Sequence, residues 1–236
     1  MLAGLLTALA FVPSQDCSQL TPGFGAYGVA YGPNGGNVRA SAVYDDGQGP
    51  ALYLGGDFDF AGDLLARAIV RFDGTSFQPL PGPGGATVLA NGGVGVRALA
   101  VFDDGGGPEL YVAGDFETSL GFPQHGLAKW NGATWTPVLA VTSQFAGFVG
   151  ISALAVWNDG TGDALYFGGT FNKVNGSPAA SIAKYDGSGW TTLGAGYVGS
   201  YVGALAVHDD GSGTELYAGG WNFPSQQSVE RWDGSS

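Results

Sequence analysis

Short apolar runs alternate with turn-forming residues along most of this chain. The run Val96–Phe102 is apolar on both faces apart from Arg97, and Leu127–Trp130 alternates with a period of two residues. Both patterns are typical of β-strands. No stretch keeps the 3.6-residue period of a helix over several turns. The pattern therefore predicts an all-β protein.

One sequence phrase occurs four times, and each occurrence predicts four short strands. The phrase has an apolar strand, an Asp-Asp-Gly or Asn-Asp-Gly turn, a Leu-Tyr strand with small residues, a strand with one basic residue, and an Asp-Gly or Asn-Gly turn before an aromatic residue. Asp, Asn and Gly tolerate positive φ, so both turns are hairpin signals. The valines that anchor the four phrases are Val43, Val101, Val156 and Val207. A sandwich would not require such repetition, whereas a β-propeller would.

The spacing inside the phrase resembles the Kelch repeat. A glycine pair, an aromatic residue and a Phe or Trp follow one another at the same intervals in three of the phrases. The residues that keep these intervals are Gly56, Phe72 and Phe77; Gly114, Trp130 and Trp135; and Gly169, Tyr185 and Trp190. The resemblance covers residues 17–236 and implies a secreted-type β-propeller of four-stranded antiparallel blades. It is specific for fold and not for function, and Ala113 departs from it by replacing one glycine.

The phrases predict about four blades, at approximately residues 38–80, 96–138, 151–193 and 202–236. The fourth phrase lacks its last strand. Because Cys17–Leu20 matches the register of Trp190–Leu193, residues 17–20 are expected to complete the last blade and remove a free sheet edge. The alternative is that the chain is a fragment of a larger ring, and the sequence does not separate the two interpretations.

Residues 1–12 contain an apolar run in which Ala8-Leu9-Ala10 resembles a small-x-small cleavage site. This run predicts an export signal, although the basic residues that usually precede such a run are missing. A buried first strand is the alternative interpretation. We therefore expect a secreted or cell-surface protein.

Composition limits the possible partners. The chain has a net charge of −12 with only eight Lys and Arg, which argues against binding to nucleic acid or to an anionic membrane. One Cys and two His exclude a disulfide framework and a Cys/His zinc site. No apolar run reaches the ~20 residues of a transmembrane segment. We expect no cofactor and no metal, and the oligomeric state stays open.

The two ends of each predicted blade carry different residues. The hairpin turns at one end are rich in Asp, which fits turn chemistry better than calcium binding because no Asp-x-Asp-x-Asp-Gly loop is present. The linking loops at the other end vary in length and contain aromatic residues, which makes them the predicted ligand-binding face. The candidate ligand-binding residues are Tyr27, Tyr31, Arg39, Arg97, Phe145, Phe148, Tyr197 and Tyr201.

Two sets of basic residues invite different interpretations. Arg39 and Arg97 begin the first strand of their phrases, where they either hold an anion in a central channel or pair with a nearby Asp. A second basic position recurs in every third strand, which indicates a shared structural role, with Asp57 and Asp115 as candidate partners. This second set consists of Arg71, Lys129, Lys184 and Arg231.

These observations predict an exported, non-catalytic scaffold that binds protein or carbohydrate at the variable-loop face. A structural repeat of a larger cell-surface protein is the alternative. A carbohydrate-active enzyme is a third possibility, since acids distant in sequence can converge. No catalytic residue is assigned, because His125 and His208 occupy unlike positions and neither lies in a recognisable nucleophile motif.

Overall fold

The computed structural model is all-β, as the sequence pattern predicts. It describes residues 29–30, 36–81, 95–115, 125–144, 149–194, 196–197, 200–211, 213–221 and 228–234. Within these ranges there is no helix, and thus no helix of the length and apolarity needed to cross a membrane. The predicted signal segment and the predicted closing strand at residues 17–20 lie outside the described residues.

Each repeated phrase forms one antiparallel sheet, and consecutive strands along the chain are neighbours within it. The first sheet has β2 (Asn37–Asp45), β3 (Pro50–Asp57), β6 (Ile69–Phe72) and β7 (Phe77–Pro79). The second has β8 (Val96–Asp103), β9 (Pro108–Asp115), β10 (His125–Trp130) and β11 (Trp135–Thr142). The third has β12 (Gly150–Asn158), β13 (Asp163–Thr170), β16 (Ile182–Tyr185) and β17 (Trp190–Thr192). The fourth has β18 (Tyr201–Asp209), β19 (Thr214–Trp221) and β20 (Val229–Trp232).

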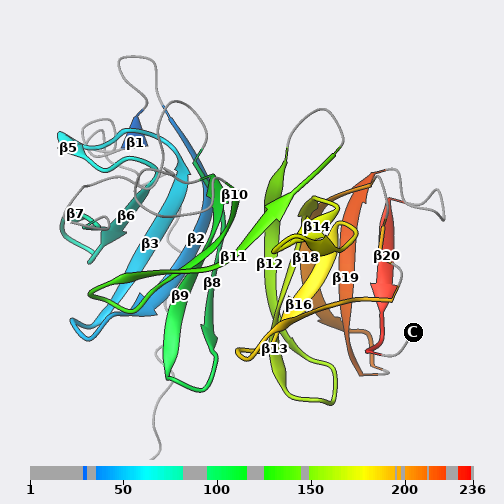
Figure 1. The fold of residues 1–236 in the computed structure, drawn as a ribbon. Coiled ribbons are helices and arrows are strands. Elements are labelled where there is room, and N and C mark those ends of the chain that lie inside the picture. The colour runs from blue at the N-terminus through cyan, green and yellow to red at the C-terminus, as the bar shows by residue number, and fades with distance from the viewer. Residues whose placement is uncertain are drawn as a thin grey trace, which may run out of the picture.

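The first strands of the four sheets lie next to one another in chain order. β2 contacts β8, β8 contacts β12, and β12 contacts β18. Figure 1 shows these four strands toward the middle of the molecule, with the later strands of the first and fourth sheets farther out on either side. Residues that start the four first strands are thereby brought close together, although they are far apart in sequence.

Two short hairpins pair with strands outside the sheet of their own phrase, which the repeat did not predict. The hairpin β14 (Lys173–Val174) and β15 (Ser177–Pro178) arises from the third phrase, but β14 pairs with β11 of the second sheet. The second sheet therefore has six strands. In β11, the residues from Trp135 to Ala140 pair with β10, and the last two, Val141 and Thr142, pair with β14.

The first phrase contains the equivalent hairpin, β4 (Phe60–Ala61) and β5 (Leu64–Leu65). Here β4 pairs with β1 (Val29–Ala30), which precedes the first sheet in the chain. Phe58 in the first phrase and Phe171 in the third occupy matching positions beside these hairpins, and both are buried. In both phrases, then, the hairpin reaches a strand that comes earlier in the sequence.

The glycine pairs of the second strands are explained by close packing. A Cβ on Gly55 would lie 2.3 Å from Cγ1 of Val96, and a Cβ on Gly168 would lie 2.4 Å from Cγ1 of Val202. In each case the valine belongs to the next sheet. The first glycine of the pair thus makes room for a valine of the neighbouring sheet.

The second glycine of the pair lies against its own sheet's first strand. A Cβ on Gly56 would be 1.9 Å from the carbonyl oxygen of Asn37, and one on Gly169 would be 2.0 Å from that of Gly150. Any side chain here would displace backbone, so the position requires glycine.

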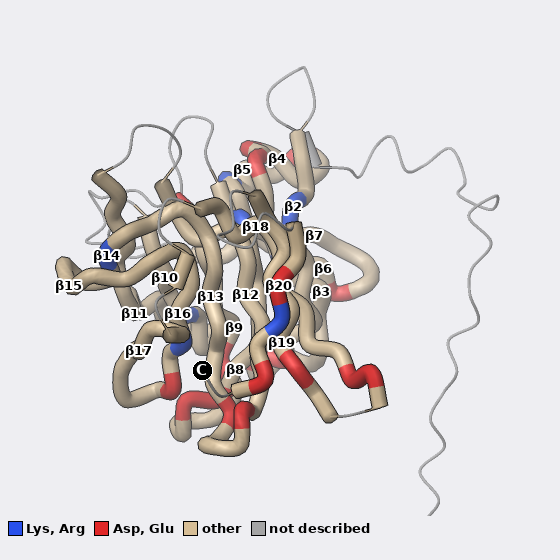
Figure 2. The backbone as a smooth tube through the Cα atoms, turned by 90° about the vertical axis from the view of Figure 1, so that its right-hand side faces the viewer, with Lys and Arg blue, Asp and Glu red and all other residues tan. Residues whose placement is uncertain are grey.

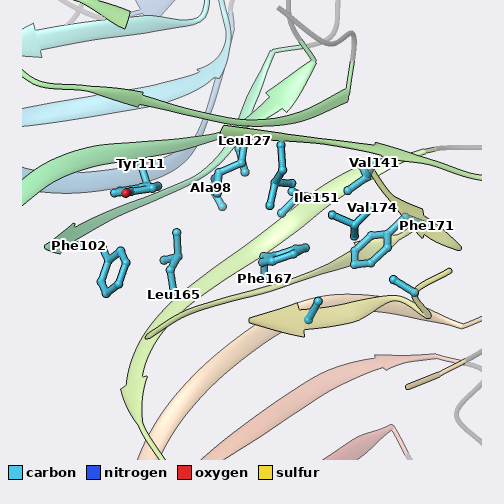
Figure 3. Close-up of a cluster of buried hydrophobic side chains, with 14 residues drawn as sticks. Ala98, Phe102, Tyr111, Leu127, Val141, Ile151, Leu165, Phe167, Phe171 and Val174 are labelled. Atoms are coloured by element: carbon cyan, nitrogen blue, oxygen red, sulfur yellow. The ribbon is translucent and has the colours of Figure 1, made fainter. Parts of the chain in front are cut away.

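The largest buried cluster lies between the second and third sheets. Figure 3 shows Tyr111 and Leu127 of the second sheet facing Leu165 and Phe167 of the third, with Val174 of the β14–β15 hairpin closing one end. Leu127, Leu165, Phe167 and Val174 are 0% exposed. At about 25 cal/mol per Å² of buried apolar area, such side chains supply most of the energy that holds adjacent sheets together.

Candidate functional site

A β-bulge occurs near the start of the first strand in all four sheets. The pairing with the second strand shifts by one residue between Val38 and Ala40, and at the equivalent place in the other sheets. A bulge leaves one residue unpaired and redirects its side chain. The bulged residues are Arg39, Arg97, Ser152 and Gly203.

All four bulged residues line one open cavity of about 520 Å³. Asn37, Val38 and Tyr201 complete its lining. The cavity lies where the four first strands begin, which is the end of the sheets that carries the linking loops. Two of the chain's eight basic residues contribute to it, although the whole chain carries a net charge of −12. The site is therefore more basic than the rest of the protein.

Each cavity arginine is held by an aspartate at the end of the second strand of its own sheet. Arg39 donates through Nε and Nη2 to Oδ2 of Asp57. The pKa of Arg39 is raised chiefly by this hydrogen bond. Arg97 donates to Oδ2 of Asp115 at 3.3 Å. Pairing with a nearby Asp is one of the two roles that the sequence suggested for these arginines. Both arginines also belong to the cavity lining.

Asp115 also contacts a histidine. Its Oδ1 makes a hydrogen bond with Nδ1 of His125, the first residue of β10. The Asp115 carboxylate is nine-tenths buried and lies between two side chains that can carry positive charge. This arrangement fixes the Arg97 side chain at the cavity wall, because the aspartate that holds it is itself held from the other side.

In place of an Arg–Asp pair, the fourth sheet has Tyr201 in the cavity lining and Trp221 beside it. Tyr201 pairs across the strands with Trp221, and their ring centroids are 6.3 Å apart. Trp221 is 62% exposed. The sequence interpretation missed Trp221, although its position in the repeat, where the other sheets have Asp57, Asp115 and Thr170, was a signal.

Of the other predicted ligand-binding aromatics, the structure describes only Tyr197, which is not part of the cavity lining. Tyr27, Tyr31, Phe145 and Phe148 lie outside the described residues. Tyr197 packs against a buried cluster between the third and fourth sheets, and its pKa is raised chiefly by burial and then by a hydrogen bond with Glu230. The described contacts of Tyr197 are therefore those of a packing residue.

The basic residue of each third strand has a structural partner, but not the predicted one. The expected partners Asp57 and Asp115 are wrong, because both bind the cavity arginines instead. In three sheets the second-strand tyrosine donates to the second acidic residue of the hairpin turn, at 2.8 to 2.9 Å, and the basic residue pairs with the same carboxylate. These sets are Tyr53–Asp46–Arg71, Tyr111–Asp104–Lys129 and Tyr166–Asp159–Lys184.

These carboxylates predict a loss of stability in acid. Burial alone would raise the pKa of Asp159, but hydrogen bonds from Lys184, Thr161 and Tyr166 outweigh it and lower that pKa below the usual 3.8. The unfolded chain then binds more protons than the folded chain around pH 4. This stabilisation is therefore complete above pH ~5, starts to fall near the unfolded pKa and is fully lost only below the lower pKa of the folded state. Urea unfolding should give similar free energies of unfolding at pH 7 and pH 5 and a smaller one at pH 3.5. A free energy that is equal at pH 7 and pH 3.5 would contradict it.

Other turn aspartates accept hydrogen bonds from backbone N–H groups. Oδ1 of Asp45 accepts from the N–H of Gly47 and Gly49 at 2.9 and 3.0 Å, and Oδ1 of Asp103 does the same for Gly105 and Gly107. Figure 2 shows that many of the acidic residues lie along the hairpins at one end of the molecule. Among the described residues, no group of three or more His, Cys, Asp or Glu is placed to hold a metal.

Comparison with known proteins gives no relative from which a function can be transferred. No family model matches the chain, and no curated protein or solved structure matches it. The function must therefore be argued from the cavity itself.

Proposed function

We propose that the chain is an exported, non-catalytic binding scaffold whose four sheets are the blades of a Kelch-like β-propeller. The observation that supports this arrangement is the succession of contacts between first strands, β2 to β8 to β12 to β18. The valine–glycine contacts between sheets one and two and between sheets three and four repeat the same packing.

The ligand, a carbohydrate or a protein segment, binds in the cavity at the loop-bearing end of the sheets. The observation that carries this proposal is that the bulged residue of all four sheets lines a single cavity. A bulge weakens the strand pairing locally, so four of them around one space indicate that the position of these side chains matters. A polar, partly enclosed site of about 520 Å³ is in the size range of small-ligand pockets.

A binding screen with a blocked cavity tests this function. The wild-type protein and a Ser152→Phe variant would be applied to arrays of glycans and of peptides, with thermal unfolding as a check on folding. We expect at least one ligand class to be retained by the wild type and lost by the variant, because the phenylalanine ring fills the cavity. Ligands that bind both proteins equally would place recognition elsewhere, and the absence of any ligand would count against a binding function.

A second candidate, a structural repeat within a larger assembly, is favoured by the terminal sheets. Val38 is 46% exposed, whereas its counterparts Val96 and Val202 are at most 1% exposed. Gly219, the counterpart of Gly168, has its nearest Cβ contact at 3.7 Å, within its own sheet. A further sheet of this repeat, or the joining of the fourth sheet to the first, would fill both positions.

A cysteine pair separates these candidates. In a Cys17→Ser background, Val38→Cys and Gly219→Cys would be introduced together and oxidised. A closed four-sheet ring predicts an intramolecular disulfide, which non-reducing electrophoresis and mass spectrometry detect. A larger assembly predicts free thiols in the isolated chain, because the Cα atoms of a disulfide must lie within about 7 Å of each other.

A further inference from the structure

Two aromatic residues of the fourth sheet, one in the cavity lining and one beside it, suggest what kind of ligand the cavity takes. Trp221 is 62% exposed and lies beside Tyr201, which lines the cavity. Tryptophan buries a large area when it meets a partner, so an exposed one beside a polar cavity indicates a contact surface. Flat aromatic rings suit the C–H face of a sugar ring.

Gly203 allows this aromatic surface to form. A Cβ at Gly203 would lie 2.7 Å from Cε1 of Tyr201, so the tyrosine ring occupies the space that a side chain would need. At the equivalent bulge the other sheets carry Arg39, Arg97 and Ser152. The fourth sheet therefore offers an aromatic wall where the others offer polar groups.

The other side of the cavity carries two guanidinium groups. Arg39 and Arg97 belong to its lining, and the lining contains no Asp or Glu. Asp57 and Asp115 hold the two guanidinium groups without themselves belonging to the lining. A guanidinium group has five N–H donors, so one that is already held by an aspartate can still donate to a second carboxylate.

Ser152 and Asn37 add uncharged polar groups to the cavity lining. Oγ of Ser152 is buried, and no hydrogen-bond partner for it is found among the described residues. Buried polar atoms are nearly always hydrogen-bonded, so an unsatisfied one calls for a partner. Asn37, a polar residue of the same lining, has a side-chain amide that can bind the hydroxyl groups of a sugar.

We infer that the cavity takes a carboxylate-bearing saccharide of the uronic acid class, with its sugar ring on Tyr201 and Trp221 and its carboxylate at Arg39 and Arg97. This inference rests on the proposed binding function. A neutral sugar has no carboxylate for the two guanidinium groups to bind. A peptide bound through its main chain would need a free strand edge or apolar pockets, and the cavity lining is mainly polar.

Titration calorimetry with matched saccharides tests the inference. Oligomers of galacturonate, glucuronate and mannuronate would be compared with neutral oligomers of galactose, glucose and mannose, which have CH₂OH in place of the carboxylate. We expect one uronate oligomer to bind at least about tenfold more tightly than its neutral counterpart, with the difference shrinking in 0.5 M NaCl. Equal affinities would overturn the carboxylate inference and leave the saccharide site standing. If none of these saccharides binds, the uronate inference falls, and the proposed binding function then depends on the peptide array.

Substitutions at and beside the cavity test where the saccharide binds. Trp221→Ala and Arg97→Gln should each weaken uronate binding about tenfold or more. Val229→Ala is the control for the first, because Val229 is a 53% exposed apolar residue of the same sheet, and Arg231→Gln is the charge-matched control for the second. Arg97→Gln should weaken binding of the uronate but not of a neutral oligomer. Equal losses in the variants and their controls would overturn the inference.

Discussion

Gly168→Ala is expected to destabilise the protein by about 2–3 kcal/mol, whereas the same change at Gly219 should cost less than about 1 kcal/mol. Both glycines occupy the same position in the repeat. At Gly168 the new methyl group would lie 2.4 Å from Cγ1 of Val202, a buried β-branched residue that cannot turn away. At Gly219 the nearest atom is 3.7 Å away, which is an ordinary contact.

Thermal unfolding measures the difference between these two variants. For a chain of this length, 2–3 kcal/mol corresponds to a decrease in Tm of roughly 4–12 °C. Gly189→Ala serves as a further control, since a Cβ there would meet nothing within 4 Å. Equal decreases in Tm for Gly168→Ala and Gly219→Ala would mean that the packing between sheets does not explain the glycine pair.

Asp159→Ala should destabilise the protein by roughly 3–5 kcal/mol, because it breaks a largely buried ion pair. The side chain of Asp159 is 5% exposed and pairs with Lys184. Its carboxylate also accepts the Tyr166 hydroxyl at 2.9 Å. Removing it takes the carboxylate away from a largely buried ammonium group and from a buried hydroxyl.

Two further variants separate the loss of this acceptor from other effects. Asp209→Ala removes an exposed turn aspartate whose Oδ1 accepts from the N–H of Gly211 and Gly213, and should cost only about 1 kcal/mol. The double variant Asp159→Leu with Lys184→Met removes both charges and should be less destabilised than Asp159→Ala. Urea unfolding gives all three values. A double variant that is the least stable of the three would contradict the proposed cause.

The repeat predicted the sheets well because its strands and turns depend on local sequence. Asp-Asp-Gly and Asp-Gly turns form hairpins through contacts within a few residues, so the position of β8 and β9 could be derived from spacing alone. The ion-pair partner of Lys129 could not be derived in this way. The choice between Asp104 and Asp115 depends on which carboxylate lies on the same face of the sheet as Lys129. The bulge at Arg97 was also hidden, because Val-Arg-Ala is equally compatible with regular alternation.

The cavity was predictable only in part. Arg39 and Arg97 were identified because each starts a first strand, and Tyr201 because it lies in a linking segment. Trp221 was missed because the importance of its position comes from a cross-strand neighbour, and Ser152 because a single serine carries no signal. The hairpin at Asn175-Gly176 has the sequence of a tight turn, but its pairing with another sheet depends on tertiary structure.

The β14–β15 hairpin has a consequence for how the chain can be divided. This hairpin belongs to the third phrase but pairs with the second sheet. The boundaries of the sequence repeat and the boundaries of the sheet therefore differ by one hairpin. Excising residues 150–193 would remove one sheet and also strip two strands from the sheet before it. Modules intended for exchange or deletion should therefore be cut so that each hairpin stays with the sheet that it completes.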